Sequence, residues 1–261
     1  MVSGQRRRRN LSLLQALSKV SGQRPLASGT LPRRLCNLTR ERRSPMTSFT
    51  SARDLLEEVA SRYRAMDSYA DSGFVQELDR PKSSPMSFET AFRRPADFKF
   101  RFSSPHPYRP KRHLISRSQV GLDAGKPYYW SQDYSSPAEL EQEESLLMAV
   151  AGTTGVSRGS AFTIWSLLFR EEGDDLFSTL ARPRFRKFAC VDGVRCHRVA
   201  AIHRGFRRID IYIGVDDLLL RGWVMRTGRF PQAEMRTNIK VGVEFSISCF
   251  SAANAATASA N

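Results

Sequence analysis

The chain has 261 residues, of which 41% are hydrophobic and 10% aromatic, so most of it can build a core and wholesale disorder is excluded. Its 41 Lys and Arg residues against 26 Asp and Glu give a net charge of +15, which raises nucleic acid as a partner. The sequence contains no apolar run of about 18 residues, which excludes a transmembrane helix, and four cysteines are too few for a disulfide-built scaffold.

The excess charge is concentrated at the N-terminus. Residues 1–50 hold 11 basic residues and one acid, Glu41, whereas residues 51–261 hold 30 basic and 25 acidic residues. The run Arg6–Arg9 and the scattered Ser, Pro and Gly predict a disordered basic leader over 1–50. Four interpretations are open: a nucleic-acid-binding arm, an organelle transit peptide, a polybasic membrane contact or an extension without a role. The apolar residues of the leader are interrupted by polar ones, which makes a poor secretory signal.

Folded structure is expected from residue 51 onwards. Ser51-Ala-Arg-Asp54 fits a helix-capping pattern, and apolar residues at helical spacing predict an amphipathic helix over 52–66. The strict alternation Phe98-Lys-Phe-Arg-Phe102 predicts a strand with three Phe side chains on one sheet face. Further strands are predicted over 68–79, 87–92, 114–120 and 127–130, with a Pro-rich loop at 103–112.

Two helices and a second group of strands are predicted next. Acidic residues favour a first helix over 137–151, ended by Gly152 or Gly155, and Ser157 or Ser160 would cap a second, strongly apolar helix that runs through Phe169. Strands are then predicted over 185–191, 194–202, 206–214, 218–225 and 239–250, with a hairpin turn at Asp192-Gly193 and a low-complexity tail at 251–261. Because strands follow one another in runs, we expect an α+β fold with antiparallel pairing and one sheet face beneath the helices.

Gly155-Val-Ser-Arg-Gly159 matches the G-x-S-x-G nucleophile elbow of hydrolases, with Asp192 and His197 or His203 downstream. The elbow requires a strand before the serine. The residues before Ser157 predict a helix instead, so the turn between two helices is the favoured interpretation. No catalytic residue is therefore predicted.

The cysteine and histidine residues near the hairpin match no tight zinc-binding spacing. A two-residue turn at Asp192-Gly193 would pair Cys190 with Arg195 and Cys196 with Ala189, which places the two sulfur atoms on opposite sheet faces. A disulfide would require a loop of odd length. We expect Cys36 and Cys249 to be unpaired, and we expect neither a metal site nor a cofactor.

Two segments resemble LolA-like outer-membrane lipoprotein carriers, the lipoprotein-sorting superfamily. Ser87–Phe102, with Arg94-Pro95 before the alternating Phe residues, is similar to the family's Arg-Pro strand pair. Ile209–Trp223, an alternating strand that turns at Asp216-Asp217, is similar to its late hairpin. The resemblance covers 52–250 in element order and is closer to uncharacterised bacterial relatives than to the carrier itself. It implies a domain over 51–250 with a curved antiparallel sheet, an incomplete β-barrel, whose apolar concave face is covered by helices acting as a lid.

The resemblance also implies a function. It indicates a non-enzymatic, periplasmic protein that binds acyl lipid or lipoprotein in the concave cavity, with a membrane-associated partner and no nucleic acid on the folded domain. A protein-interaction or stress-sensor module on the same fold is the alternative, and nucleic-acid binding by the basic leader is a further one. Arg94 matches the arginine that holds the carrier's lid shut, with a plain surface cation as the alternative. The expected cavity lining, for which ordinary core packing is the alternative, is Phe98, Phe100, Phe102, Tyr128, Trp130, Ile164, Leu167 and Leu168.

Overall fold

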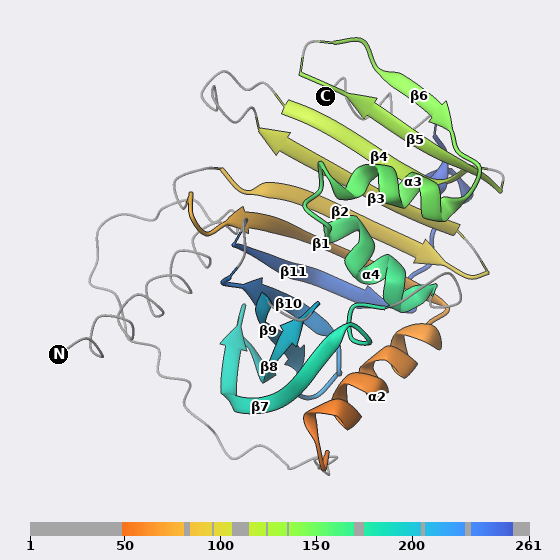
Figure 1. Ribbon diagram of the computed structural model, residues 1–261. Helices are drawn as coiled ribbons and strands as arrows, with labels where there is room; N and C mark the ends of the chain where they lie inside the picture. Colours follow the sequence, from red (N-terminus) through yellow and green to blue (C-terminus); the bar gives the residue numbers. More distant parts are fainter. Residues whose placement is uncertain are drawn as a thin grey trace, which may run out of the picture. The chain divides into compact units, whose positions relative to one another are not determined.

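The computed structural model describes residues 49–80, 84–95, 97–105, 115–123, 125–134, 136–169, 175–204, 207–227 and 231–252. Residues 1–48 of the predicted leader, Cys36, the predicted loop from 106 onwards and the predicted tail from 253 onwards lie outside these residues. The described elements, shown in Figure 1, are α2 (Ala52–Arg64), β1 (Ser68–Glu77), β2 (Met86–Arg93), β3 (Asp97–Pro105), β4 (Ile115–Asp123), β5 (Lys126–Gln132), β6 (Glu139–Gln142), α3 (Leu146–Thr154), α4 (Ser160–Leu168), β7 (Leu180–Val191), β8 (Val194–His203), β9 (Arg207–Gly214), β10 (Leu220–Met225), β11 (Gln232–Val241) and the 3-10 turn η3 (Ile247–Phe250).

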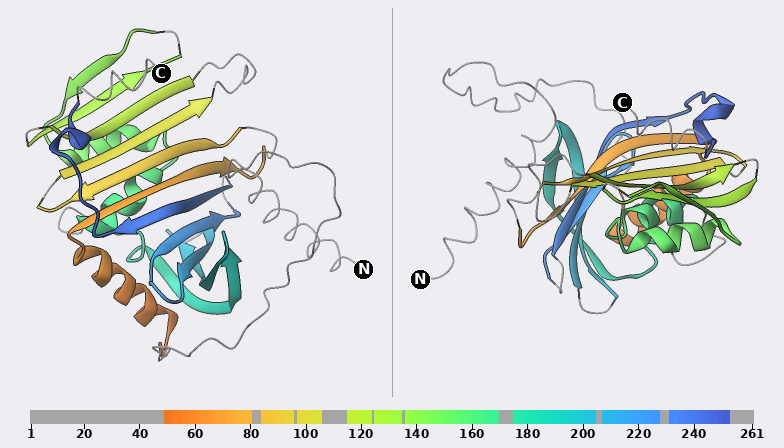
Figure 2. Two further views of the ribbon diagram at one scale, coloured as in Figure 1. Left: turned by 180° about the vertical axis from the view of Figure 1, so that it is seen from behind. Right: turned by 90° about the horizontal axis from the view of Figure 1, so that it is seen from above.

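The strands of the described part form one antiparallel sheet of eleven strands in the order β6-β5-β4-β3-β2-β1-β11-β10-β9-β8-β7. The sheet is open, with β6 and β7 as its two edges, and it curves around the helices α2, α3 and α4, which lie on one of its faces (Figures 1 and 2). The predicted α+β fold with an incomplete barrel is therefore confirmed. No helix of the described residues has the length and apolar character needed to span a membrane.

Helix α2 forms where the sequence predicts it. The Ser51 hydroxyl accepts a hydrogen bond from the Asp54 amide at 3.1 Å, and the Asp54 carboxylate accepts one from the Ser51 amide at 3.0 Å. This reciprocal pair is the capping box that the spacing predicts. The apolar stripe of the helix, which includes Leu55, Val59 and Tyr63, is fully buried against the sheet. The amphipathic pattern thus seats α2 on the concave face.

The β7–β8 hairpin also forms as predicted. Asp192 and Gly193 have φ values of 49° and 79°, the left-handed backbone that a two-residue type I′ turn requires. The resulting register pairs Cys190 with Arg195 and Ala189 with Cys196, which confirms the predicted pairing. Cys190 and Cys196 are consequently free, as is Cys249.

Several predicted element boundaries are wrong, and strand β7 begins at Leu180 rather than at 185. Residues 137–145 do not begin a helix, because Glu139–Gln142 forms the edge strand β6, which pairs with β5 and leaves all four side chains exposed. Helix α3 begins only at Leu146, where the Ser145 hydroxyl accepts a hydrogen bond from the Met148 amide at 3.2 Å. An acidic segment fits a helix start and an exposed edge strand equally well, and strand pairing decided the outcome.

The predicted last strand over 239–250 is likewise displaced. Strand β11 runs from Gln232 to Val241, and the chain then forms the turn η3. The first half of β11 was missed because it alternates polar residues that a sequence pattern assigns to solvent, although the structure buries them. These residues belong to the candidate site.

Candidate functional site

A pair of short helices covers the concave face of the sheet. We call residues 146–168 the lid: they comprise α3, a turn and α4, and Arg158 in the turn is their one charged residue. Helix α3 packs on β4 and β5, and α4 packs on α3 and α2. Met148 and Val156 on the outer side are nevertheless 53% and 50% exposed. A helix that stays packed on a core usually has a polar outer face. The lid instead has more apolar surface than the sheet and α2 cover.

The sheet presents an aromatic surface to the lid. Phe98, Phe100 and Phe102 of β3 alternate inward and are at most 2% exposed. The structure brings these three residues together in one buried cluster with the lid residues Ile164, Leu167 and Leu168 of the predicted lining.

Phe169, just after α4, connects the lid to this aromatic surface. Its ring lies 5.3 Å from that of Phe92 and 5.8 Å from that of Phe98, both edge to face, and 6.0 Å from that of Trp165 in α4. Such geometries are the favourable ones for aromatic pairs. Phe169 is thus a lid contact that the predicted lining omitted.

Tyr128 and Trp130 do not join this cluster. The register pairs Tyr129 with Val120 and Val120 with Phe100, so Tyr129 shares the concave face with the aromatic surface. Tyr128 and Trp130 alternate with it and therefore point to the opposite face. There they pack with Ala252, and the Tyr128 hydroxyl donates to the Phe250 carbonyl at 3.3 Å. The C-terminal turn, rather than the lid, covers these two residues.

Polar side chains of β11 connect the lid to the sheet. Gln232, Glu234 and Arg236 alternate along the strand, and we call them the β11 polar row. The Gln232 amide donates to the Arg158 carbonyl at 2.8 Å. The Thr163 hydroxyl of α4 donates to the Glu234 carboxylate at 2.9 Å. Arg236 donates to the carbonyl that begins α4, at residue 160 and 3.2 Å. The row thus holds the start of α4 on the concave face.

Arg236 is the centre of a fully buried ionic cluster. Its guanidinium donates to the Glu234 carboxylate at 2.6 and 3.0 Å and forms an ion pair with Asp71, and the side chains of all three residues are 0% exposed. The Tyr69 hydroxyl donates to the same Asp71 oxygen at 2.6 Å. The guanidinium also stacks 4.7 Å from the Phe88 ring centre. Buried charges are tolerated when they are paired and hydrogen-bonded in this way.

A glycine provides the room for that stacking. Gly73 pairs with both Arg236 and Phe88 in the sheet. A Cβ atom at Gly73 would lie 2.3 Å from the Phe88 ring and 2.2 Å from the Met235 carbonyl oxygen. A larger residue here would displace the ring on which Arg236 rests.

The protonation of Glu234 is expected to make stability depend on pH. Burial raises the pKa of Glu234 above its ordinary 4.5, although Arg236 opposes the shift, and the neighbouring Asp71 adds to it. A carboxyl group with a raised folded-state pKa contributes stability below the unfolded pKa and loses it as pH rises through the folded pKa.

We therefore expect Glu234→Gln, which cannot titrate, to gain stability relative to the wild type as pH rises above 4.5. Urea unfolding of both proteins over a pH series measures this difference. The exposed Glu139→Gln in β6 is the control and should show no such trend. A constant difference between wild type and Glu234→Gln would contradict the expectation.

Arg94, the predicted lid latch, contacts a different helix. It is exposed, and its Nε donates to the Met66 carbonyl at 2.9 Å while its Nη2 donates to the Arg64 carbonyl. The Arg64 carbonyl is at the end of helix α2, and Met66 lies just beyond it. Its guanidinium also lies 5.4 Å from the Phe92 ring centre. The geometry places a cation at the negative end of the α2 dipole, and a role in holding the lid remains a prediction.

The G-x-S-x-G segment forms the turn between α3 and α4. A helix precedes Ser157, as predicted, and the serine is 0% exposed. The N-cap position of helix α4 is Gly159, with φ of 87°, rather than Ser157 or Ser160, but the Ser157 hydroxyl accepts a hydrogen bond from the Ala161 amide in the first turn at 3.4 Å. The elbow architecture of a hydrolase is thus absent at this serine. Among the described residues, no group of three or more His, Cys, Asp or Glu side chains is placed to hold a metal ion.

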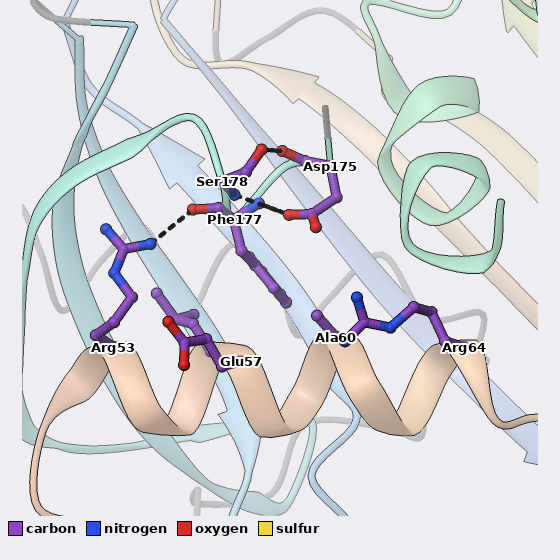
Figure 3. A pocket seen from close by; sticks show the side chains of 8 residues that line it. Arg53, Glu57, Ala60, Arg64, Asp175, Phe177 and Ser178 are labelled. Atoms are coloured by element: carbon purple, nitrogen blue, oxygen red, sulfur yellow. Dashed lines mark hydrogen bonds between the residues drawn. The ribbon is translucent and has the colours of Figure 1, made fainter. Parts of the chain in front are cut away.

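A small pocket lies beside the lid, between α2 and the segment 175–178 (Figure 3). Its volume is about 160 Å³. Arg53 donates to the Phe177 carbonyl at 3.1 Å, and the Asp175 carboxylate accepts from the amides of Phe177 and Ser178, both at 2.8 Å. The complete lining is Arg53, Leu56, Glu57, Ala60, Arg64, Asp175, Phe177 and Ser178. The pocket therefore has an apolar floor and a charged rim.

The β11 polar row and this pocket were not predicted from the sequence. Glu234 and Arg236 alternate with apolar residues, which is the pattern of a strand with one solvated face. The one available signal was that Asp71 and Glu234 offer opposite charges to Arg236, but their pairing depends on the β1–β11 register.

Comparisons with known proteins give structural matches alone. No family model matches the chain, and no curated protein matches it. Among solved structures, MucB in the Pseudomonas aeruginosa MucA/MucB complex is 13% identical, with 77% of this chain and 60% of that chain covered and a TM-score of 0.39. LprF from Mycobacterium bovis is 8% identical, with 75% and 95% covered and a TM-score of 0.45. A LolA superfamily protein from Nitrosomonas europaea is 8% identical, with 79% and 100% covered and a TM-score of 0.32.

These matches concern the fold, and one of them is to a protein of the LolA superfamily, which the sequence resembles. This chain spans 60% of the length of MucB. Because every one of these TM-scores is below 0.5, the function is inferred from the residues of this chain.

Proposed function

We propose that the chain binds the acyl chains of a lipid or lipoprotein between the lid and the concave face of the sheet. The observation that carries the proposal is the apolar lid, which has no charge in either helix and exposes Met148 and Val156 while it covers an aromatic surface. Each methylene group moved from water into such an interface contributes about 0.8 kcal/mol, so acyl chains suit it.

Binding requires the lid to move. The pocket beside it measures about 160 Å³, whereas sites for drug-sized ligands measure roughly 300–1,000 Å³. The aromatic surface under the lid is already fully packed. An acyl chain would therefore replace the contacts of the lid with apolar contacts of similar chemistry. The free-energy change of this exchange is small as a result.

Two buried polar atoms, one in the lid and one on the concave face of the sheet, support the same site. The indole nitrogen of Trp165 and the hydroxyl of Thr90 have no hydrogen-bond partner in the described part of the chain. A buried donor without an acceptor is costly. The ester or amide carbonyl of an acylated ligand would supply an acceptor for Trp165, and free hydrocarbon would not.

Polar contacts also hold the lid in place. The β11 polar row contacts the start of α4, and Arg94 contacts the end of α2, which packs on α4. Under this proposal both hold the empty, closed state, and Arg94 retains its predicted role as a latch. The periplasm, implied by the family resemblance, remains the predicted location.

Native mass spectrometry of the purified chain is the direct test. We expect protein from a bacterial host to carry acyl lipid, and the lipid-free chain to take up a fluorescent fatty acid. Phe100→Asp, on the concave face, should abolish uptake, whereas Phe185→Asp, at a 39% exposed position, should retain it. Trp165→Phe keeps the ring and removes the donor, so it should weaken binding of an ester lipid more than that of a long-chain alkane, which has no acceptor.

Two results would contradict the proposal. Lipid-free protein together with no uptake by the wild type would exclude acyl binding. Equal uptake by Phe100→Asp, with the variant folded by circular dichroism, would place the ligand elsewhere.

A further inference from the structure

The charge of the described domain is concentrated in one hairpin. We call residues 180–203, which form β7 and β8, the basic hairpin. They contain six Lys and Arg residues and one acid, Asp192, a net charge of +5. Residues 51–261 as a whole also carry +5, so the rest of that region is neutral on balance. Five of the six cations are exposed: Arg182, Arg184, Arg186, Lys187 and Arg195.

Two exposed aromatic side chains also belong to the hairpin, and Phe185, which pairs with the buried Val199, lies on the strand face opposite Arg184 and Arg186. Phe185 and Phe188 are 39% and 47% exposed. Both rings contact His197, at 5.9 and 5.2 Å between ring centres, and the Arg195 guanidinium lies 4.4 Å from the Phe188 ring centre. Burial and the neighbouring Arg195 lower the pKa of His197. The hairpin thus combines an apolar aromatic patch with a strong positive charge.

The hairpin is also the free edge of the sheet, but its backbone is poorly suited to adding another strand. Strand β7 has register shifts between Ala181 and Arg184 and between Arg186 and Ala189. Pro183 has no amide hydrogen, and Arg182 has a left-handed φ of 53°. Bulges and proline are the devices that prevent edge-to-edge pairing. Recognition by side chains is therefore favoured over strand addition by a peptide or a second copy.

We propose that the basic hairpin docks the protein on a bilayer that carries anionic phospholipid. Arginine and lysine side chains near such a surface are attracted to its negative charge, and apolar Phe side chains enter the boundary between headgroups and acyl chains. The two exposed Phe residues would enter the interface while the cations contact phosphate groups. This proposal concerns a surface on the β7 edge, distinct from the lid, and does not depend on the proposed acyl binding.

Vesicle binding by the full chain tests the proposal, with phosphatidylcholine vesicles that contain or lack phosphatidylglycerol, in about 0.15 M salt. The basic leader is present in every variant, so it contributes equally throughout. Reversing Arg184 and Arg186 to Glu should weaken binding to the anionic vesicles by roughly fivefold or more for each cation. The matched control reverses the exposed Lys126 and Lys240 to Glu and should change binding by less than about twofold.

The aromatic patch is tested in the same assay. Phe185→Ser with Phe188→Ser should weaken binding at unchanged charge, whereas Ile115→Ser with Val241→Ser, at positions 36% and 47% exposed, should not. Hydrogen exchange on the vesicles should show new protection within 184–190. Both pairs of variants alter exposed residues, and urea unfolding checks that they fold alike.

Several results would overturn the proposal. They are absence of binding to anionic vesicles, equal binding to phosphatidylcholine alone, equal loss in the control variants, or protection confined to residues 1–48. Dimers that are lost in the Phe variants, without a change in vesicle binding, would assign the hairpin to a second copy of the chain.

Discussion

Replacing Arg236 with methionine is expected to lower the free energy of unfolding by about 3–5 kcal/mol. The guanidinium is 0% exposed and is the positive partner of Asp71 and Glu234, which are also buried. Its removal leaves two carboxylates in the core without a counter-charge. It also removes the hydrogen bond to the start of α4, so the lid should loosen as the domain is destabilised.

Urea unfolding measures this loss of stability, and two further variants test its cause. Arg226→Met, at an ion pair of 3.6 Å to Asp210 with 40% of the Arg226 side chain exposed, should cost less than about 1 kcal/mol. Adding Asp71→Asn and Glu234→Gln to Arg236→Met should recover part of the stability, because the buried charges are then neutral. If the triple variant is no more stable than Arg236→Met, unpaired charge is not the cause.

Phe100→Ala is expected to destabilise the domain by about 3–5 kcal/mol. We expect a bound fatty acid to restore part of this lost stability. The side chain is 1% exposed and stacks on Phe88 at 5.6 Å, so its truncation leaves a cavity beneath the lid. An acyl chain that fills this cavity binds the folded state alone. At a fatty-acid concentration of 100 times the Kd, such binding adds about 2.7 kcal/mol.

The matched control is Trp130→Ala on the other face of the same sheet. Trp130 is 4% exposed, so its truncation should cost a similar amount, about 3–5 kcal/mol. Its cavity would lie under the C-terminal turn, near Ala252, and away from the lid. Thermal unfolding with and without palmitate should therefore rescue Phe100→Ala alone. Equal rescue of both variants, or of neither, would contradict a ligand site under the lid.

The buried ionic cluster and the apolar lid have opposite consequences for lid movement. The apolar contacts can be exchanged for an acyl chain at little cost, whereas separating α4 from Glu234 and Arg236 leaves charged groups short of hydrogen bonds. The β11 polar row therefore favours one defined position of α4 on the concave face. This suits a protein whose empty state must be closed.

Local patterns in the sequence were sufficient for much of the fold. Ser51 and Asp54 carry their capping box within four residues, and Asp192-Gly193 carries its turn within two. The alternation Phe98-Lys-Phe-Arg-Phe102 places three rings on one face whatever the rest of the chain does. Patterns of this kind, within a few consecutive residues, predict the antiparallel sheet and the helices that cover it. They also predict that Cys190 and Cys196 are unpaired.

Tertiary structure alone decided which face each strand turns to the lid and which charges are buried. Alternation separates Tyr128 and Trp130 from Tyr129 but does not say which set is concave, because only the register with β4 and β3 fixes that. Segment 139–142 became a strand because β5 offered it a partner. Arg236 has the sequence pattern of a solvated cation, but β1 and α4 cover it in the structure. Apart from Glu234, the groups that accept its hydrogen bonds, the Asp71 carboxylate and the carbonyl of residue 160, come from residues distant in the chain.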